Sequence, residues 1–193
     1  ARAEVINDRG LPLITSAIMK GLREPDGFVG KTLKLASFAQ RVFFKDASHA
    51  GGLQSRLPLP YITDERLVPP LAKKFFMDIV EGDDRDAVFS SEKTAKVGFF
   101  AGCLINYVMP DIGLASLKVL EKTGAAVIVP HGQTCCGMPA ISMGDFEDAK
   151  ALALKNLEVF EAHDLDFITT SCATCTDGLK RKFRQLLEDE GPE

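Results

Sequence analysis

Five cysteines are the residues of this chain whose type and spacing could support chemistry. Cys103, Cys135, Cys136, Cys172 and Cys175 follow the pattern C-x31-C-C-G-x34-C-x-x-C, and the sequence contains no other cysteine. Thiolates are the soft ligands that bind zinc and iron–sulfur clusters. Because the number of thiols is odd, they cannot all close into disulfides within the chain, and a reducing compartment is favoured. The pattern predicts a metal centre.

Two glycines are immediate neighbours of these cysteines. Gly102 precedes Cys103, and Gly137 follows Cys136. A glycine lets the backbone approach a metal centre closely, and its N–H group can donate to a sulfide. Ordinary turn geometry explains a glycine at either position equally well, so both interpretations stay open.

The cysteines lie in a region where strand and helix patterns alternate. Short apolar runs predict strands over 96–101, 125–129 and 166–170, and helical spacing predicts helices after Pro110, after Asp145 and through Leu179–Leu187. Strand–helix alternation predicts an α/β fold with a small parallel sheet built from βα units.

Finer features of these helices follow from the same patterns. The first helix is expected to end at Gly124, and Thr174 with Asp177 is the expected cap of the last one. The expected buried stripe of the helix after Asp145 consists of Phe146, Ala149, Ala153, Leu157 and Phe160.

Each cysteine follows the end of a predicted strand. Cys103 comes after the first strand, Cys135 and Cys136 after the second, and Cys172 and Cys175 after the third. Because the carboxyl ends of parallel strands meet at one edge of a sheet, where α/β folds bind their ligands, we expect all five sulfurs to gather there. Helix amino termini at that edge would lower the pKa of the thiols.

The chain before this region contains no cysteine. We expect two domains, a helical and proline-rich extension over 1–92 and a cysteine-rich domain over 93–193. In the extension, helical spacing appears over 14–21 and 29–44, where Leu35, Phe38 and Val42 share a stripe. The proline-rich stretch over 57–71 is either a strap on the domain surface or a plain linker, followed by a charged turn over 81–86.

Composition limits the classes of partner. The 193 residues are 46% hydrophobic, which allows a packed core, and the net charge of −4 argues against nucleic acid as a partner. The longest apolar runs are too short to cross a bilayer, and the first residues lack the apolar core of a signal peptide. We expect a cytoplasmic protein, with association at the inner face of the membrane only through a partner.

A family resemblance rests on several segments around the cysteines. Gly102-Cys-Leu, Pro130-His-Gly-Gln-Thr-Cys-Cys-Gly-Met-Pro, Gly144-Asp, Lys155-Asn-Leu and Ser171-Cys-Ala-Thr-Cys resemble the cysteine-rich CCG domain. That domain occurs in the B subunit of heterodisulfide reductase and in iron–sulfur subunits of glycolate oxidase, lactate-utilisation enzymes and anaerobic glycerol-3-phosphate dehydrogenase. Residues 12–80 resemble, less strongly, the linker of glycolate-oxidase-type subunits. Those subunits carry two copies of the motif and this chain has one, so we expect a fragment of a longer chain holding half of a pseudo-symmetric pair; the alternative is a natural single-motif member.

The resemblance implies a cofactor and a function. It implies that Cys103, Cys135, Cys136, Cys172 and Cys175 hold a [4Fe–4S] cluster, which is noncubane in the heterodisulfide reductase relatives. A cubane needs four thiolates, so the fifth implies a bridging ligand, an altered cluster or a reactive thiol. The implied function is an electron-transfer subunit of a flavin-dependent hydroxyacid oxidoreductase, with a flavoprotein donor and a quinone or cytochrome acceptor. The alternatives are a heterodisulfide or thiol–disulfide reductase component and a structural zinc module.

Overall fold

The computed structural model describes residues 2–10, 16, 19, 21–23, 28–46, 53–55, 69–80, 87–89 and 95–188. The helices and strands, in chain order, are α1 (Arg2–Arg9), α3 (Phe28–Phe43), β1 (Phe44–Asp46), β2 (Leu53–Ser55), α4 (Phe76–Val80), β3 (Ala87–Phe89), β4 (Lys96–Phe99), α5 (Gly102–Tyr107), α6 (Pro110–Lys122), β5 (Ala126–Val129), α7 (Met138–Met143), α8 (Phe146–Glu161), β6 (Phe167–Thr169), α9 (Ala173–Asp177), the π-helical turn η1 (Gly178–Lys182) and α10 (Phe183–Glu188).

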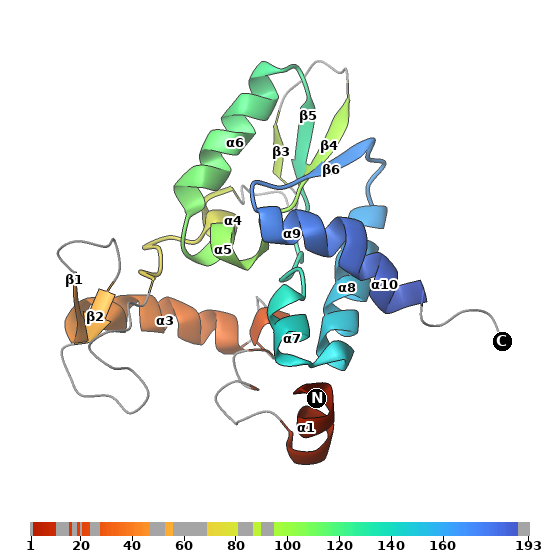
Figure 1. The fold of residues 1–193 in the computed structure, drawn as a ribbon. Coiled ribbons are helices and arrows are strands. Elements are labelled where there is room, and N and C mark those ends of the chain that lie inside the picture. The colour runs from red at the N-terminus through yellow and green to blue at the C-terminus, as the bar shows by residue number, and fades with distance from the viewer. Residues whose placement is uncertain are drawn as a thin grey trace.

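A four-stranded sheet with the order β3-β5-β4-β6 organises the cysteine-rich part of the chain (Figure 1). Strands β4, β5 and β6 run parallel, with Val97 of β4 opposite Val127 of β5 and Phe167 of β6. The predicted three-stranded parallel unit is therefore confirmed. Strand β3 was not expected; it pairs antiparallel with β5, although it lies before the domain boundary that we place at residue 92. That boundary stays a prediction.

The helices predicted after Pro110 and after Asp145 are present, and their ends lie close to the residues expected to bound them. Pro110 occupies the first turn of α6, and Gly124 follows its end with a φ of 80°. Asp145 caps α8, because its carboxylate accepts a hydrogen bond of 3.0 Å from the Asp148 N–H. The short helices α5 and α7 were not expected.

Two details of the helix predictions were wrong. Of the predicted stripe of α8, Ala149, Ala153 and Phe160 are buried and Leu157 is half-buried, but Phe146 is 48% exposed, and the buried face also includes Leu152 and Asn156. The last helical segment begins at Ala173 with Cys172 as its N-cap residue, so Thr174 lies inside the first turn and is not a cap.

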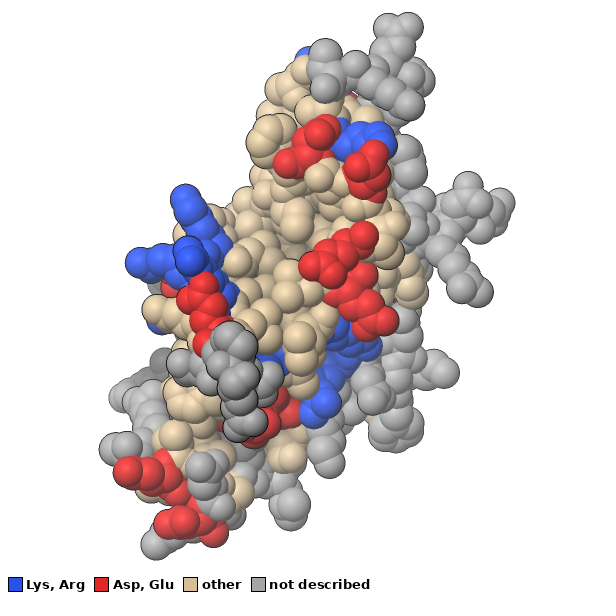
Figure 2. Space-filling view, turned by 90° about the vertical axis from the view of Figure 1, so that its right-hand side faces the viewer, with Lys and Arg blue, Asp and Glu red and all other residues tan. Residues whose placement is uncertain are grey.

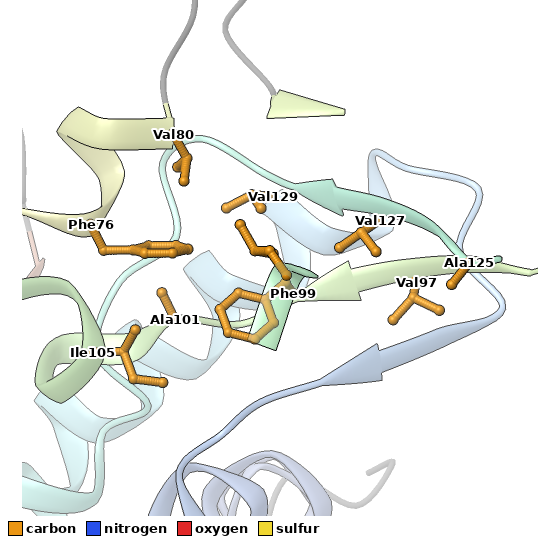
Figure 3. Packing of buried hydrophobic residues seen from close by; sticks show 10 residues of the cluster. Phe76, Val80, Val97, Phe99, Ala101, Ile105, Ala125, Val127 and Val129 are labelled. Carbon is orange, nitrogen blue, oxygen red and sulfur yellow. The ribbon is translucent and has the colours of Figure 1, made fainter. Parts of the chain in front are cut away.

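Hydrophobic clusters cover both faces of the sheet. Figure 3 shows the cluster on the face covered by α4, α5 and α6, where Phe76 of α4 points toward Phe99 of β4 with ring centroids 5.7 Å apart. On the other face, Phe100 and Phe160 pack at 5.8 Å, and the same cluster includes Cys135, Cys136 and Cys175. The sulfur-bearing residues thus belong to the hydrophobic core.

For the part of the chain before the sheet, the predictions from sequence are compared with the structure only at the described residues. Helix α3 confirms the predicted helix over 29–44, and its end leads into a hairpin of β1 and β2. On this helix, Leu35 is 68% and Phe38 65% exposed. Three predicted segments lie outside the described residues: the charged turn, the proline-rich stretch up to residue 68 and the helix over 14–21. Of that helix, only Ser16, Met19 and Gly21 are described.

Strand β6 forms one edge of the sheet and carries exposed apolar side chains. Strand β6 pairs with β4 on one side, and on it Phe167 is 65% and Ile168 47% exposed. No helix in the described part of the chain has the length and apolarity needed to cross a membrane.

Candidate metal centre

All five cysteines gather at the carboxyl edge of the parallel strands. Cys103 lies in the first turn of α5 after β4, and Cys135 and Cys136 lie in the loop between β5 and α7. Cys172 is the N-cap residue of α9, which follows β6, and Cys175 lies within that helix. Each βα unit returns the chain to the same edge, which brings together residues more than thirty positions apart. The structure therefore places the predicted ligands in one site.

The sulfurs lie close enough to influence one another. The Cys135 thiol donates to the Cys103 sulfur at 3.6 Å. The pKa of Cys136 responds to the neighbouring Cys135 and Cys175 thiols, and the pKa of Cys175 responds to Cys136 and Cys172. All five thiols are free, and no disulfide joins them. The three strand ends thus bring the five cysteines into one neighbourhood, with the sulfurs of Cys103 and Cys135 in direct contact.

These contacts divide the thiols into proton donors and acceptors. Hydrogen bonds from the Cys135 and Cys175 thiols lower the pKa of Cys136 to about 3, and the bond from Cys135 lowers the pKa of Cys103. The same bonds, together with burial, raise the pKa of Cys135 and of Cys175. Because a metal binds thiolates, filling this site requires protons to leave Cys135 and Cys175.

The site is enclosed by the protein core. Cys135, Cys136 and Cys175 are each 2% exposed, whereas Cys103 and Cys172 are half-buried. A cavity of about 10 Å³, roughly the space of one water molecule, adjoins it. The residues that line this cavity are Leu22, Met77, Ala101, Gly102, Cys103, Asn106, Tyr107, Gln133, Thr134 and Cys135.

The two predicted glycines have different surroundings. Gly102 has a φ of +64°, and a Cβ atom there would lie 2.9 Å from the Cys175 sulfur. Gly137 caps α7, and a Cβ atom there would lie 3.2 Å from the Ala149 carbonyl oxygen. Gly102 thus lets α5 approach a site sulfur, while Gly137 lets the loop pack against α8. Their roles toward a metal stay predictions.

Sequence reasoning missed a third glycine at the site. Gly178 begins the π-helical turn η1, and a Cβ atom there would lie 3.3 Å from both the Cβ atom and the carbonyl oxygen of Cys136. Single π-helical turns within helices are frequent at functional sites. The one signal in the sequence was its position three residues after Cys175, but no periodicity distinguishes a π-turn from an α-turn.

Other polar groups lie close to the cysteines in the sequence. His131, four residues before Cys135, is half-buried in the loop after β5. Among the described residues, no three His, Cys, Asp or Glu side chains are arranged as ligands of a single metal ion. Of the basic residues that follow Cys175, Lys180, Arg181 and Arg184 are exposed and Lys182 is half-buried, and Arg181 pairs with Asp177 while Arg184 pairs with Glu188. In the view of Figure 2, a group of Lys and Arg side chains at the left and a group of Asp and Glu side chains at the right are separated by uncharged residues, and further charges of both signs lie above and below.

The fold and the site define a class of protein: an α/β domain that gathers cysteine thiols at the edge of a parallel sheet. Comparison with protein families agrees, because residues 97–180 match the family described as "Cysteine-rich domain", CCG. This segment of the chain is a CCG cysteine-rich domain. No solved structure matches the chain.

Relatives of the chain are named as iron–sulfur proteins or as subunits of oxidoreductases. An uncharacterized iron-sulfur protein of Methanococcus maripaludis is 32% identical over 64% of this chain and 24% of its own length. The B subunit of fumarate reductase (CoM/CoB) from Methanothermobacter marburgensis is 43% identical over 46% of this chain and 18% of its own length. A probable glycolate oxidase iron-sulfur subunit of Bacillus subtilis is 28% identical over 82% of this chain and 35% of its own length. The chain thus spans well under half the length of these relatives.

Proposed function

We propose that this chain binds an iron–sulfur cluster through Cys103, Cys135, Cys136, Cys172 and Cys175 and passes electrons within a larger oxidoreductase. The observation that carries the proposal is the gathering of five cysteines at the ends of three parallel strands, with the Cys103 and Cys135 sulfurs 3.6 Å apart, in a segment whose relatives are named iron–sulfur proteins. When bound, such a cluster supplies one-electron chemistry.

The donor set fits an iron–sulfur cluster. Five soft thiols, one more than a tetrahedral zinc ion binds, favour an iron–sulfur cluster over one zinc ion. We propose a [4Fe–4S] cluster, with the fifth thiol allowing the noncubane form. The protein's own contribution is to bury three of the sulfurs, which excludes water from them, and to hold two strand loops and α9 within contact distance.

Metal content tests this proposal directly. The chain is produced anaerobically in cells with an intact cluster-assembly system, and iron, acid-labile sulfide and zinc are measured per chain. We expect about four iron and four sulfide, with a loss of iron in each Cys→Ser variant. The variant Thr174→Ala, at an exposed position between Cys172 and Cys175, is the matched control and should keep its iron. One zinc and no iron would support the structural zinc module instead.

We further propose a flavoprotein as electron donor and a small hydroxy acid, glycolate or lactate, as the substrate of the parent complex. Support comes from the probable glycolate oxidase iron-sulfur subunit, whose similarity extends over 158 residues and so includes part of the chain before the cysteines. A quinone or cytochrome would accept the electrons. Mixing the reduced flavoprotein with the loaded chain should bleach cluster absorption within milliseconds; no electron transfer to the cluster would reject this partner.

A second candidate function is thiol–disulfide chemistry at the same site. It is favoured by the relative named as a component of fumarate reductase (CoM/CoB) and by the direct contact of the Cys103 and Cys135 sulfurs. The loaded chain would then reduce a disulfide substrate when supplied with a strong electron donor. Absence of turnover with any disulfide would exclude this function and leave the electron-transfer proposal standing.

A further inference from the structure

Two buried side-chain carboxamides lie beside the sulfurs without contributing a ligand. Gln133 is 6% exposed and belongs to the loop that carries Cys135 and Cys136, and Asn156 is 1% exposed and bonds to the same loop. Amide side chains are seldom buried unless their hydrogen bonds are made, because an unmet polar group in the core is unfavourable. Their partners therefore indicate what they stabilise.

Asn156 of α8 bonds to the backbone on both sides of Cys135. Its Oδ1 atom accepts from the Thr134 N–H at 2.7 Å, and its Nδ2 group donates to the Cys135 carbonyl oxygen at 3.0 Å. The second Nδ2 hydrogen bonds the Leu152 carbonyl oxygen at 2.9 Å, one turn earlier in the helix. The carboxamide is thus fixed to α8 at one end and holds residues 134 and 135 at the other.

Gln133 joins the ends of two neighbouring strands. Its Oε1 atom accepts from the Ala101 N–H at 2.8 Å, directly before the Gly102–Cys103 segment. Its Nε2 group donates to the carbonyl oxygens of Phe99 and Pro130 at 3.2 and 3.0 Å. The loop that carries Cys103 and the loop that carries Cys135 are therefore held together by one side chain, consistent with the 3.6 Å between their sulfurs.

The contacts require an amide at both positions. Each side chain uses one acceptor and two donor hydrogens, and every partner is a backbone group. A carboxylate of the same size has only acceptors, so at position 156 it would place an oxygen against the Cys135 and Leu152 carbonyl oxygens. A leucine would leave the buried Thr134 N–H without its Asn156 acceptor, and the Cys135 carbonyl oxygen would keep only the 3.3 Å bond from the Thr134 hydroxyl.

We propose that Asn156 and Gln133 are positioning residues that hold the Cys103 and Cys135 backbone in a ligand-presenting arrangement before any metal binds. They form a hydrogen-bonded frame with α8 at one end and the β4 and β5 strand ends at the other. The proposal deepens the proposed function and rests on it only for the effect on the bound cluster, since the frame itself is a property of the metal-free chain.

The first test measures the metal-free 193-residue chain under native conditions. Per-cysteine alkylation rates are followed by mass spectrometry, with Cys172 as an internal reference because no bond to Asn156 or Gln133 involves its loop. Two lost buried hydrogen bonds correspond to about a tenfold rise in opening, so Asn156→Leu should raise the Cys135-to-Cys172 rate ratio by about ten. Leu117→Ala, which removes buried side-chain volume from α6 on the other face of the sheet, should leave this ratio within about twofold.

An unchanged ratio in Asn156→Leu, or the same rise in Leu117→Ala, would overturn the proposal. Where Asn156→Leu does not fold, the isosteric variants Asn156→Asp and Gln133→Glu are measured in the same way. These variants keep the side-chain volume but replace the amide donors with acceptors, so each should raise the Cys135-to-Cys172 rate ratio. No rise in either variant would also overturn the proposal.

The second test uses the metal-loaded chain. Asn156→Asp retains all five cysteines, so we expect it to bind the metal while shifting the midpoint potential and the electron paramagnetic resonance spectrum of the cluster; Leu117→Ala should match the wild type. Unaltered spectra in Asn156→Asp would contradict a positioning role. A wild-type chain that binds no iron would instead reject the proposed function, and the alkylation result would still decide the role of the frame.

Discussion

Gly102 offers the sharpest test of how tightly the sulfurs are packed. Its φ is +64°, and a Cβ atom would meet the Cys175 sulfur at 2.9 Å and a ring carbon of Phe100 at 3.1 Å. Left-handed backbone disfavours an alanine by about 1–2 kcal/mol. Because Cys175 and Phe100 are both buried and neither can move freely, overpacking adds about 1–3 kcal/mol. Gly102→Ala should therefore reduce the free energy of unfolding by about 2–5 kcal/mol.

Gly132 supplies a matched control for this prediction. Its φ is +82°, but a Cβ atom there would find its nearest neighbour, a methyl group of Val159, at an ordinary 3.6 Å. Gly132→Ala should lose only the backbone contribution of about 1–2 kcal/mol. Urea unfolding of both metal-free variants measures the difference, and equal losses would refute the packing of Gly102 against the Cys175 sulfur.

Three further predictions concern the cap of α8, the protons of the site and the sheet edge. Asp145→Ala should lower the unfolding free energy by about 1 kcal/mol by removing the bond to the Asp148 N–H, and an unchanged urea midpoint would contradict the cap. Zinc binding should release protons from Cys135 and Cys175, because their hydrogen bonds raise the pKa values of these two thiols. Zinc affinity should therefore rise with pH. Calorimetry in two buffers of different ionisation enthalpy detects the proton release, and no release would contradict the assignment of protons to these thiols. Phe167→Lys, on the exposed edge of β6, should change the free energy of unfolding by less than about 0.5 kcal/mol. It should also reduce any self-association seen by light scattering. Unfolding of this variant would mean that the edge is covered.

The sequence predicted the site better than it predicted the details that hold the site. Cysteines at the ends of three predicted strands had to meet, because parallel strands share one carboxyl edge. Helices α6 and α8 were predictable from Pro110, Gly124 and the cap Asp145, since these residues act locally.

What escaped the sequence depends on contacts between distant residues. Asn156 interrupts an apolar helix face, and only its bond to the Thr134 N–H reveals why a polar group is buried there. The apolar spacing of α3 predicted a helix correctly, but it does not say whether a partner surface exists, and Leu35 and Phe38 are exposed. Strand β3 was missed because it pairs antiparallel with β5, about forty residues further along the chain, and lies outside the repeating βα pattern that revealed the other strands.

The central claim is that five cysteine sulfurs bind one iron–sulfur cluster, and the most direct measurement is electron paramagnetic resonance of the chain. The chain is reconstituted anaerobically with iron and sulfide, and spectra are recorded before and after reduction with dithionite. We predict that one redox state shows the signal of a single cluster and that Cys→Ser substitution at any of the five positions alters or abolishes it. A chain that takes up no iron and shows no signal in either state, or one whose spectrum is indifferent to all five substitutions, would contradict the account.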